Sequence, residues 1–284
     1  MKKYILPIFL VSLLFSSCKK KTVIETELNL IGLKPETFKL IDTTFYDNKK
    51  IKSLRFIKTK TEYIDVFFYE SGKKKSIGPV KKNQCHNKYV DWYENGKDKW
   101  TREYFYGKQI GKSIEYQENG NLNQINDNDK KEITEYWKNG NPKMKFKEGG
   151  LQYFYYSNGN FLDKYDPINK TEYLVKFFNE NGKIVFSGNS KSNILYKNND
   201  KYNGKIICFF NNGKISHFEE IINGVNEGKF YSYYGNGILK FEGDYKNGKE
   251  LFYKCYYENG KVNFIRDAKN KTFTQWNEKG ELIK

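Results

Sequence analysis

One phrase recurs along most of this chain: two aromatic residues, a variable residue, Asn, Gly, Lys and an apolar residue. It appears as WYENGK at 92–97, YWKNGN at 136–141, YYSNGN at 155–160, FFNNGK at 209–214, YYGNGI at 233–238 and YYENGK at 256–261. Looser copies are FYESGK at 68–73, YQENGN at 116–121, FFNENGK at 177–183 and QWNEKGE at 275–281. A fixed period over most of a chain predicts a stack of small, similar units.

The glycines of the phrase define this period. Successive glycines are 19 to 24 residues apart, except for one spacing of 31 residues. These glycines are Gly72, Gly96, Gly120, Gly140, Gly159, Gly182, Gly213, Gly237, Gly260 and Gly280. The segment FYDNKKIKSL at 45–54 is an eleventh, degenerate copy with Lys49 in the glycine position. A lysine there must accept a positive φ at a steric cost or use a different turn.

Each copy of the phrase predicts a β-hairpin. Asn-Gly between aromatic and aliphatic runs favours a type I′ turn, which needs positive φ at both central residues. Apolar residues then follow the glycine at the second and fourth places, as Leu239 and Phe241 do after Gly237, and so share one face of a strand. Further Asn-Gly pairs at 203–204, 223–224 and 247–248 predict second turns.

The fold expected is therefore all-β: an elongated antiparallel meander of about eleven hairpins over residues 39–284. If all hairpins add to one sheet, its length is about 100 Å. Each hairpin would contact only its neighbours, so the array is close to one-dimensional.

The phrase resembles the MORN-repeat variant family, whose unit of some twenty residues carries an aromatic pair followed by Asn-Gly-Lys. The resemblance covers roughly residues 40–284 and depends on the repetition rather than on any single copy. It implies the same elongated meander. Many bacterial members are described as antitoxin-like proteins, whereas classical members are linked to membranes and scaffolding.

The N-terminus predicts export. Residues 1–17 have a basic start at Lys2 and Lys3, a short apolar stretch and two small serines, which is the pattern of a signal peptide. Cys18 follows directly and resembles the lipidated cysteine of a bacterial lipoprotein, although Phe15 stands where Leu is usual. The alternative is an ordinary signal peptide with an incidental cysteine. Residues 18–38 are then the lipid anchor and tether, and the protein is expected in the bacterial cell envelope, on the periplasmic face or the cell surface.

The formal net charge of +16 raises the expectation of acidic partners. Basic runs that could contact anionic lipid headgroups include Lys73, Lys74, Lys75, Lys81 and Lys82. The alternative is a solvated edge on which lysines prevent strand addition. Nucleic acid is not an expected partner, because the protein is exported and its ring pairs are better used between strands.

No reactive constellation stands out, so no catalytic residue, metal or cofactor is expected. His217 stands four residues after Gly213, where other copies carry Phe, Met or Trp, and is expected to pack. Cys85 and His86 have no second ligand pair at metal spacing. Cys208 and Cys255 lie two repeats apart, about 19 Å in a regular sheet, which is too far for a disulfide.

These patterns favour a non-catalytic binding or scaffolding lipoprotein that presents a long repeat surface to a protein or an envelope polymer. One alternative is an antitoxin-like or immunity-like protein that captures a toxin. A second alternative is a binder of anionic lipid or glycan.

Overall fold

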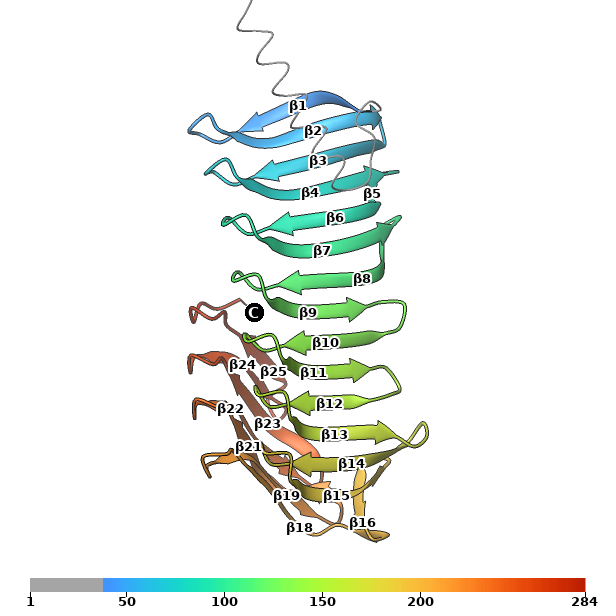
Figure 1. Cartoon of the computed structure of the whole chain (residues 1–284), viewed down its shortest axis with the longest axis vertical. Helices are drawn as coiled ribbons and strands as arrows, with labels where there is room; N and C mark the ends of the chain where they lie inside the picture. The colour runs from blue at the N-terminus through green and yellow to red at the C-terminus, as the bar shows by residue number, and fades with distance from the viewer. Residues whose placement is uncertain (1–37, 284) are drawn as a thin grey trace, which may run out of the picture. The chain divides into compact units, whose positions relative to one another are not determined.

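The computed structural model describes residues 38–283, so the signal peptide, Cys18 and the tether up to residue 37 lie outside the described part. Within it the chain consists of β-strands and turns, without a helix. The strands follow one another along the chain (Figure 1). The chain divides into two compact units, unit 1 up to Lys130 and unit 2 from Lys131. The expected all-β class and antiparallel hairpin array are confirmed.

Unit 1 is an antiparallel meander in which strands adjacent in sequence pair, except that β4 pairs both with the two-residue β5 and with β6. Its strands are β1 (Lys39–Phe45), β2 (Ile51–Thr59), β3 (Glu62–Phe68), β4 (Lys74–Lys81), β5 (Gln84–Cys85), β6 (Asn87–Trp92), β7 (Asp98–Phe105), β8 (Lys108–Tyr116) and β9 (Leu122–Asp127).

One face of unit 1 is apolar. Cross-strand partners from β2 to β6 place Leu54, Val66, Ile77 and Val90 in one row. Ile77 is fully buried, and it belongs to a cluster with Phe56, Ile64, Val66, Val90 and Trp92. The opposite face carries charges such as the Arg55–Asp65 pair, whose side chains are 2.6 Å apart. This alternation is what the period of two dictates for a strand.

Unit 2 contains two antiparallel sheets. The first runs in chain order through β10 (Glu132–Tyr136), β11 (Pro142–Lys147), β12 (Gln152–Tyr155), β13 (Phe161–Pro167), β14 (Glu172–Phe178), β15 (Ile184–Lys191), β16 (Ile194–Lys197) and β17 (Asp200–Lys201). The second consists of β18 (Gly204–Phe209), β19 (Ile215–Ile222), β20 (Val225–Asn226), β21 (Gly228–Tyr233), β22 (Leu239–Lys246), β23 (Lys249–Tyr256), β24 (Val262–Asp267) and β25 (Thr272–Gln275).

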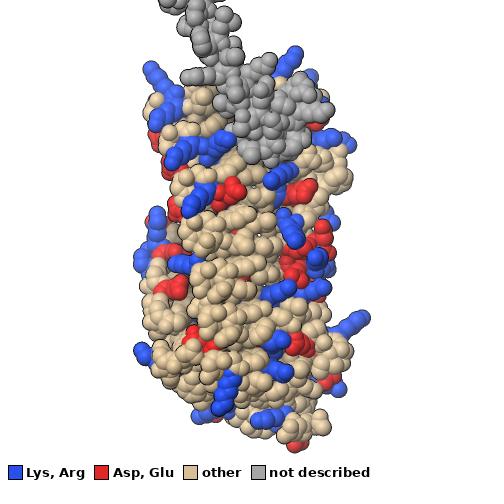
Figure 2. All heavy atoms as spheres, viewed as in Figure 1, with Lys and Arg blue, Asp and Glu red and all other residues tan. Residues whose placement is uncertain are grey.

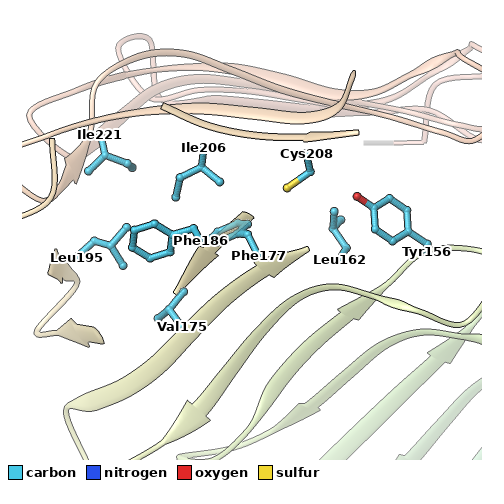
Figure 3. Packing of buried hydrophobic residues seen from close by; sticks show 9 residues of the cluster. All are labelled: Tyr156, Leu162, Val175, Phe177, Phe186, Leu195, Ile206, Cys208 and Ile221. Carbon is cyan, nitrogen blue, oxygen red and sulfur yellow. The ribbon is translucent and has the colours of Figure 1, made fainter. Parts of the chain in front are cut away.

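The two sheets of unit 2 pack face to face. Ile206, Cys208 and Ile221 of the second sheet meet Phe177 and Phe186 of the first in one buried cluster (Figure 3). The expectation of one continuous sheet is therefore wrong for unit 2, where the hairpins are divided between two layers. The physical reason is that stacking removes from water the apolar rows that a single sheet would leave exposed.

The phrase forms a turn that differs from the expected one. At Gly96, the Tyr93 amide donates to the Lys97 carbonyl, and the Gly96 amide donates to the Tyr93 carbonyl at 2.9 Å. Only the glycine has positive φ, at 88°, so this is a type I turn closed by a left-handed glycine rather than a type I′ turn. The Asn95 side chain accepts the Lys97 amide at 3.0 Å, which holds asparagine in the ordinary region.

Type I′ geometry occurs in the second turns, at the strand ends opposite the phrase turns. Asn223 and Gly224 both have positive φ, and so do Asn247 and Gly248. In the remaining pair, at 203–204, only Gly204 has positive φ. Lys49 has φ 64°, so it adopts the left-handed conformation that its glycine position demands.

Candidate binding surface

The second aromatic residue of the phrase joins one hairpin to the next. In unit 1, Tyr69 donates its hydroxyl to the Trp92 carbonyl and Tyr93 donates to the Tyr116 carbonyl, both at 2.8 Å. In unit 2, Tyr156 donates to the Phe178 carbonyl at 2.9 Å. The same bond recurs from Tyr46, Tyr234 and Tyr257, and Trp137 donates its indole N–H in the equivalent place. These bonds form a tyrosine ladder that fixes the spacing of successive hairpins.

The asparagine of the phrase adds a second bond between hairpins. While its oxygen closes its own turn, its amide donates to a turn carbonyl of the following hairpin, as Asn95 does to Glu118 at 2.9 Å. Asn139, Asn158, Asn236 and Asn259 do the same. The phrase is thus explained by contacts between hairpins as well as by the turn itself.

Each phrase hairpin from Lys49 to Gly260 carries a β-bulge three residues after its glycine position. The register shifts there because the bulged residue has no partner on the neighbouring strand. In β4, for example, Lys74 pairs with Phe68 and Ser76 pairs with Phe67, so Lys75 between them is unpaired in the ladder. In unit 1 the bulged lysine lies over the ring of its own turn: Lys52 over Tyr46, Lys75 over Tyr69 and Lys99 over Tyr93, with Nζ 5.5 to 5.8 Å from the ring centroid. These three pairs form a lysine–tyrosine row.

The ten predicted turn glycines all stand in these turns, with φ between 79° and 94°. The predicted basic runs do not form one patch. Lys73, Lys74 and Lys75 lie where β4 begins, and Lys81 and Lys82 where it ends, about 20 Å away at strand rise. On the visible face, Lys and Arg side chains are interspersed with carboxylates (Figure 2).

The cysteines and histidines occupy packed positions. Cys85, Cys208 and Cys255 are free, and three strands separate β18, which carries Cys208, from β23, which carries Cys255. His86 packs against the Tyr106 ring at 4.5 Å. His217 is 7% exposed and stacks on Phe177. No group of three metal-ligating side chains occurs among residues 38–283.

Two ionisable residues that face the space between the sheets of unit 2 are absent from the sequence-based expectations. Asp163 stands four residues after Gly159, as His217 stands four residues after Gly213. The side chains of Asp163 and His217 interact electrostatically. Lys240 is a bulged residue whose Nζ lies 5.3 Å from the centroid of Trp137 in the other sheet. A comparison of these two places across all copies would have identified both residues.

Burial shifts the protonation of both residues. It raises the pKa of Asp163 to about 7, and one oxygen of that carboxyl is buried without a hydrogen bond. Burial, together with repulsion from Lys143, lowers the pKa of Lys240 to about 8. Both ring nitrogens of His217 also lack a hydrogen-bond partner in the described structure. Asp163 interacts electrostatically with both His217 and Lys240.

The repeats match a known family. Residues 226–247 and 253–270, in the second sheet of unit 2, match the MORN repeat variant family, so the chain carries MORN repeats. No curated protein sequence matches the chain. Within the described residues, no helix has the length and apolar character needed to span a membrane.

Solved structures give no further guide. One described as "Crystal Structure of TarM" is 13% identical, with 40% of this chain and 22% of that chain covered and a TM-score of 0.23. Another, "Crystal Structure of TcdB2-TccC3-Cdc42", is 10% identical, with 84% of this chain and 15% of that chain covered and a TM-score of 0.18. The chain spans less than a quarter of either, and neither likeness bears on its function.

Proposed function

We propose that this MORN-repeat protein is a non-catalytic binding or scaffolding lipoprotein of the bacterial envelope, anchored through Cys18. It presents its repeat surface to a protein or an envelope polymer. MORN repeats in an all-β array fit a binding or scaffolding role, and an array offers a long surface rather than an enclosed cleft.

The observation that supports this proposal most is the lysine–tyrosine row of unit 1. The tyrosine ladder holds Tyr46, Tyr69 and Tyr93 at the same place in successive hairpins. Their lysines therefore recur every two strands, at intervals of about 10 Å. A lysine held over a ring has lost freedom before any partner arrives, which reduces the entropy cost of binding. Regularly spaced cations suit an extended partner with regularly spaced acidic groups.

The test is recovery of partners from native envelopes by the full chain and by a variant with Lys52, Lys75 and Lys99 changed to Gln. A specific partner that the variant recovers at least tenfold less well supports the proposal. A matched control changes three lysines outside the row, Lys60, Lys88 and Lys108, which removes the same charge. Equal loss in the control, or no partner in either case, would contradict a role for the row.

Anchoring has its own test. Cys18→Ala should release the protein from membranes into the soluble fraction, and mass spectrometry should find a lipidated Cys18 at the mature N-terminus. A free N-terminus at another residue would refute the anchor. A toxin recovered as the partner would favour the immunity-like alternative, and salt-sensitive binding to anionic lipid vesicles would favour the lipid alternative.

A further inference from the structure

The tyrosine ladder of unit 2 is interrupted at Phe210. This residue takes the place of the second aromatic in the turn between β18 and β19 (Figure 1), but it has no hydroxyl to donate to the next hairpin. By analogy with Tyr156 and Tyr234, the acceptor would be the carbonyl of Tyr233. The amide nitrogen of Asn212, which would form the second bond, has no partner among the described residues.

A second departure lies opposite, in the turn between β21 and β22. Gly235 takes the variable place of the phrase, where other copies carry larger residues such as Glu94, Glu118 and Glu258. A Cβ built on Gly235 would meet nothing closer than the Ser157 hydroxyl at 3.9 Å, so the space beside it is open. Between these two irregular turns lies a pocket of about 510 Å³, a volume in the range of roughly 300–1,000 Å³ typical of ligand sites.

The lining of this pocket combines rings with hydrogen-bonding groups. Phe210, Ile215, Tyr231 and Tyr233 supply its apolar part, and the Asn212 and Asn236 turns supply amides and carbonyls. Tyr231 also stacks on Phe218 with an interplanar angle of 10° and a centroid distance of 4.9 Å. Tyr231 is thereby held as a fixed flat surface on the outer face of the sheet.

The charged side chains that line the pocket are all positive. Lys214 contributes an ammonium group, and no Asp or Glu lines the pocket. A ligand should therefore carry negative charge as well as an apolar face and several hydroxyl groups. A sugar ring offers C–H bonds to the electron-rich ring faces and hydroxyls that both donate and accept. A carboxylate on the sugar would pair with Lys214.

We propose that the pocket between the Phe210 and Gly235 turns binds an acidic saccharide, a sugar chain bearing carboxylate groups. The inference rests on the proposed binding function and specifies its ligand as an envelope glycan. The two irregular residues border the site: tyrosine at 210 would restore the ladder bond, and glutamate at 235 would place a negative charge beside the pocket.

The test is calorimetric titration of the full chain with tetragalacturonate as the acidic probe and cellotetraose as the neutral one. Tetragalacturonate should bind at least tenfold more tightly than cellotetraose. Tyr233→Ala should weaken its binding at least tenfold, and Lys214→Gln should abolish the preference for the acidic probe. Equal binding of both probes to the unmodified chain would overturn the acidic assignment.

The decisive variant, Phe210→Tyr with Gly235→Glu, gives the two irregular turns the residues that other copies of the phrase carry. We call it the repaired chain. It should lose tetragalacturonate binding while its melting temperature stays unchanged or rises, because a missing bond between hairpins is restored. The matched control is Tyr257→Phe, which breaks the ladder two turns away and should retain binding. If the repaired chain binds as before, or if neither probe binds the original chain, the saccharide site is refuted. An envelope partner still recovered in that case would leave the broader binding function standing.

Discussion

Asp163 in the first sheet of unit 2 and His217 in the second interact electrostatically across the interface between the sheets. Each stands four residues after the glycine of its phrase, and both lie against Phe177, Asp163 as its cross-strand partner and His217 as a stacked ring. Two departures from the repeat thus meet in space, although they are 54 residues apart in the chain.

The burial of Asp163, which outweighs the opposing effect of His217 on its pKa, predicts how stability depends on pH. Burial raises the pKa of Asp163 from 3.8 to about 7, so between these values the folded state holds a proton that the unfolded state has released. The free energy of unfolding should therefore fall as the pH rises from about 4 to about 7, by up to about 4 kcal/mol from this group. Asp163→Asn should remove that fall.

Urea unfolding of the chain and of the variant at a series of pH values measures this difference. The exposed Asp200→Asn is the control and should leave the pH profile unchanged. Parallel profiles for the Asp163 variant and the original chain would show that this carboxyl ionises as freely when folded as when unfolded.

A single hydroxyl in the tyrosine ladder should have a measurable effect. Tyr93→Phe removes the 2.8 Å bond to the Tyr116 carbonyl but keeps the ring, so unit 1 should lose about 1 kcal/mol. Tyr104→Phe is the matched control, because its hydroxyl makes no hydrogen bond within the described residues. Chemical denaturation followed by the hydrogen exchange of unit 1 amides reports both. Equal effects would mean that the ladder bond adds nothing beyond ring packing.

Glycine in the middle of a strand marks a place where a ring covers the backbone. A Cβ on Gly243 would lie 2.1 Å from the Phe230 ring and 2.7 Å from the Phe252 carbonyl oxygen. Gly243→Ala should therefore destabilise unit 2 by about 1–3 kcal/mol, because the backbone on one side cannot move away. Gly235→Ala, whose Cβ would meet nothing closer than the Ser157 hydroxyl at 3.9 Å, should be nearly neutral in the same urea titration. A neutral Gly243→Ala would show that Phe230 adjusts without cost.

The repeat and the hairpins were predictable because they depend on local signals. Asn-Gly, the alternation after each glycine and the period of about 23 residues act within a few residues of each other. The turn type was predicted wrongly, since the Asn95 side chain bonds the Lys97 amide and so favours a type I turn that the dipeptide alone does not reveal.

The stacking of two sheets depends on contacts distant in sequence and was not predicted. One local signal was present: the step from Gly182 to Gly213 is 31 residues, and the chain changes sheets within it, between β17 and β18. Asn179 also replaces the ladder tyrosine there, and its side chain accepts the Phe209 amide of the other sheet at 2.9 Å. The saccharide pocket is similarly marked only by the replacement of Tyr by Phe210 and of a larger residue by Gly235.

The two rings of the phrase should contribute unequally to stability. Tyr234 faces the interface between the sheets, where its hydroxyl bonds the Tyr256 carbonyl and its ring lies against Trp137. Tyr233 lies on the other face beside Tyr231. Tyr234→Ala should therefore cost about 3 kcal/mol or more, and Tyr233→Ala much less. Thermal unfolding of the two variants provides the comparison, and equal losses would contradict the assignment of faces.

The same variant tests whether damage stays local. An array has interfaces only between neighbours, so loss of Tyr234 should weaken hydrogen-exchange protection in the strands of unit 2. Unit 1 contains its own buried cluster around Ile64 and Ile77, and its amides should keep their protection. Even loss of protection from Phe45 to Trp276 would mean that the chain unfolds as one cooperative body. Separate stretches of the array could not then serve separate partners, because a partner bound to one unit would stabilise both.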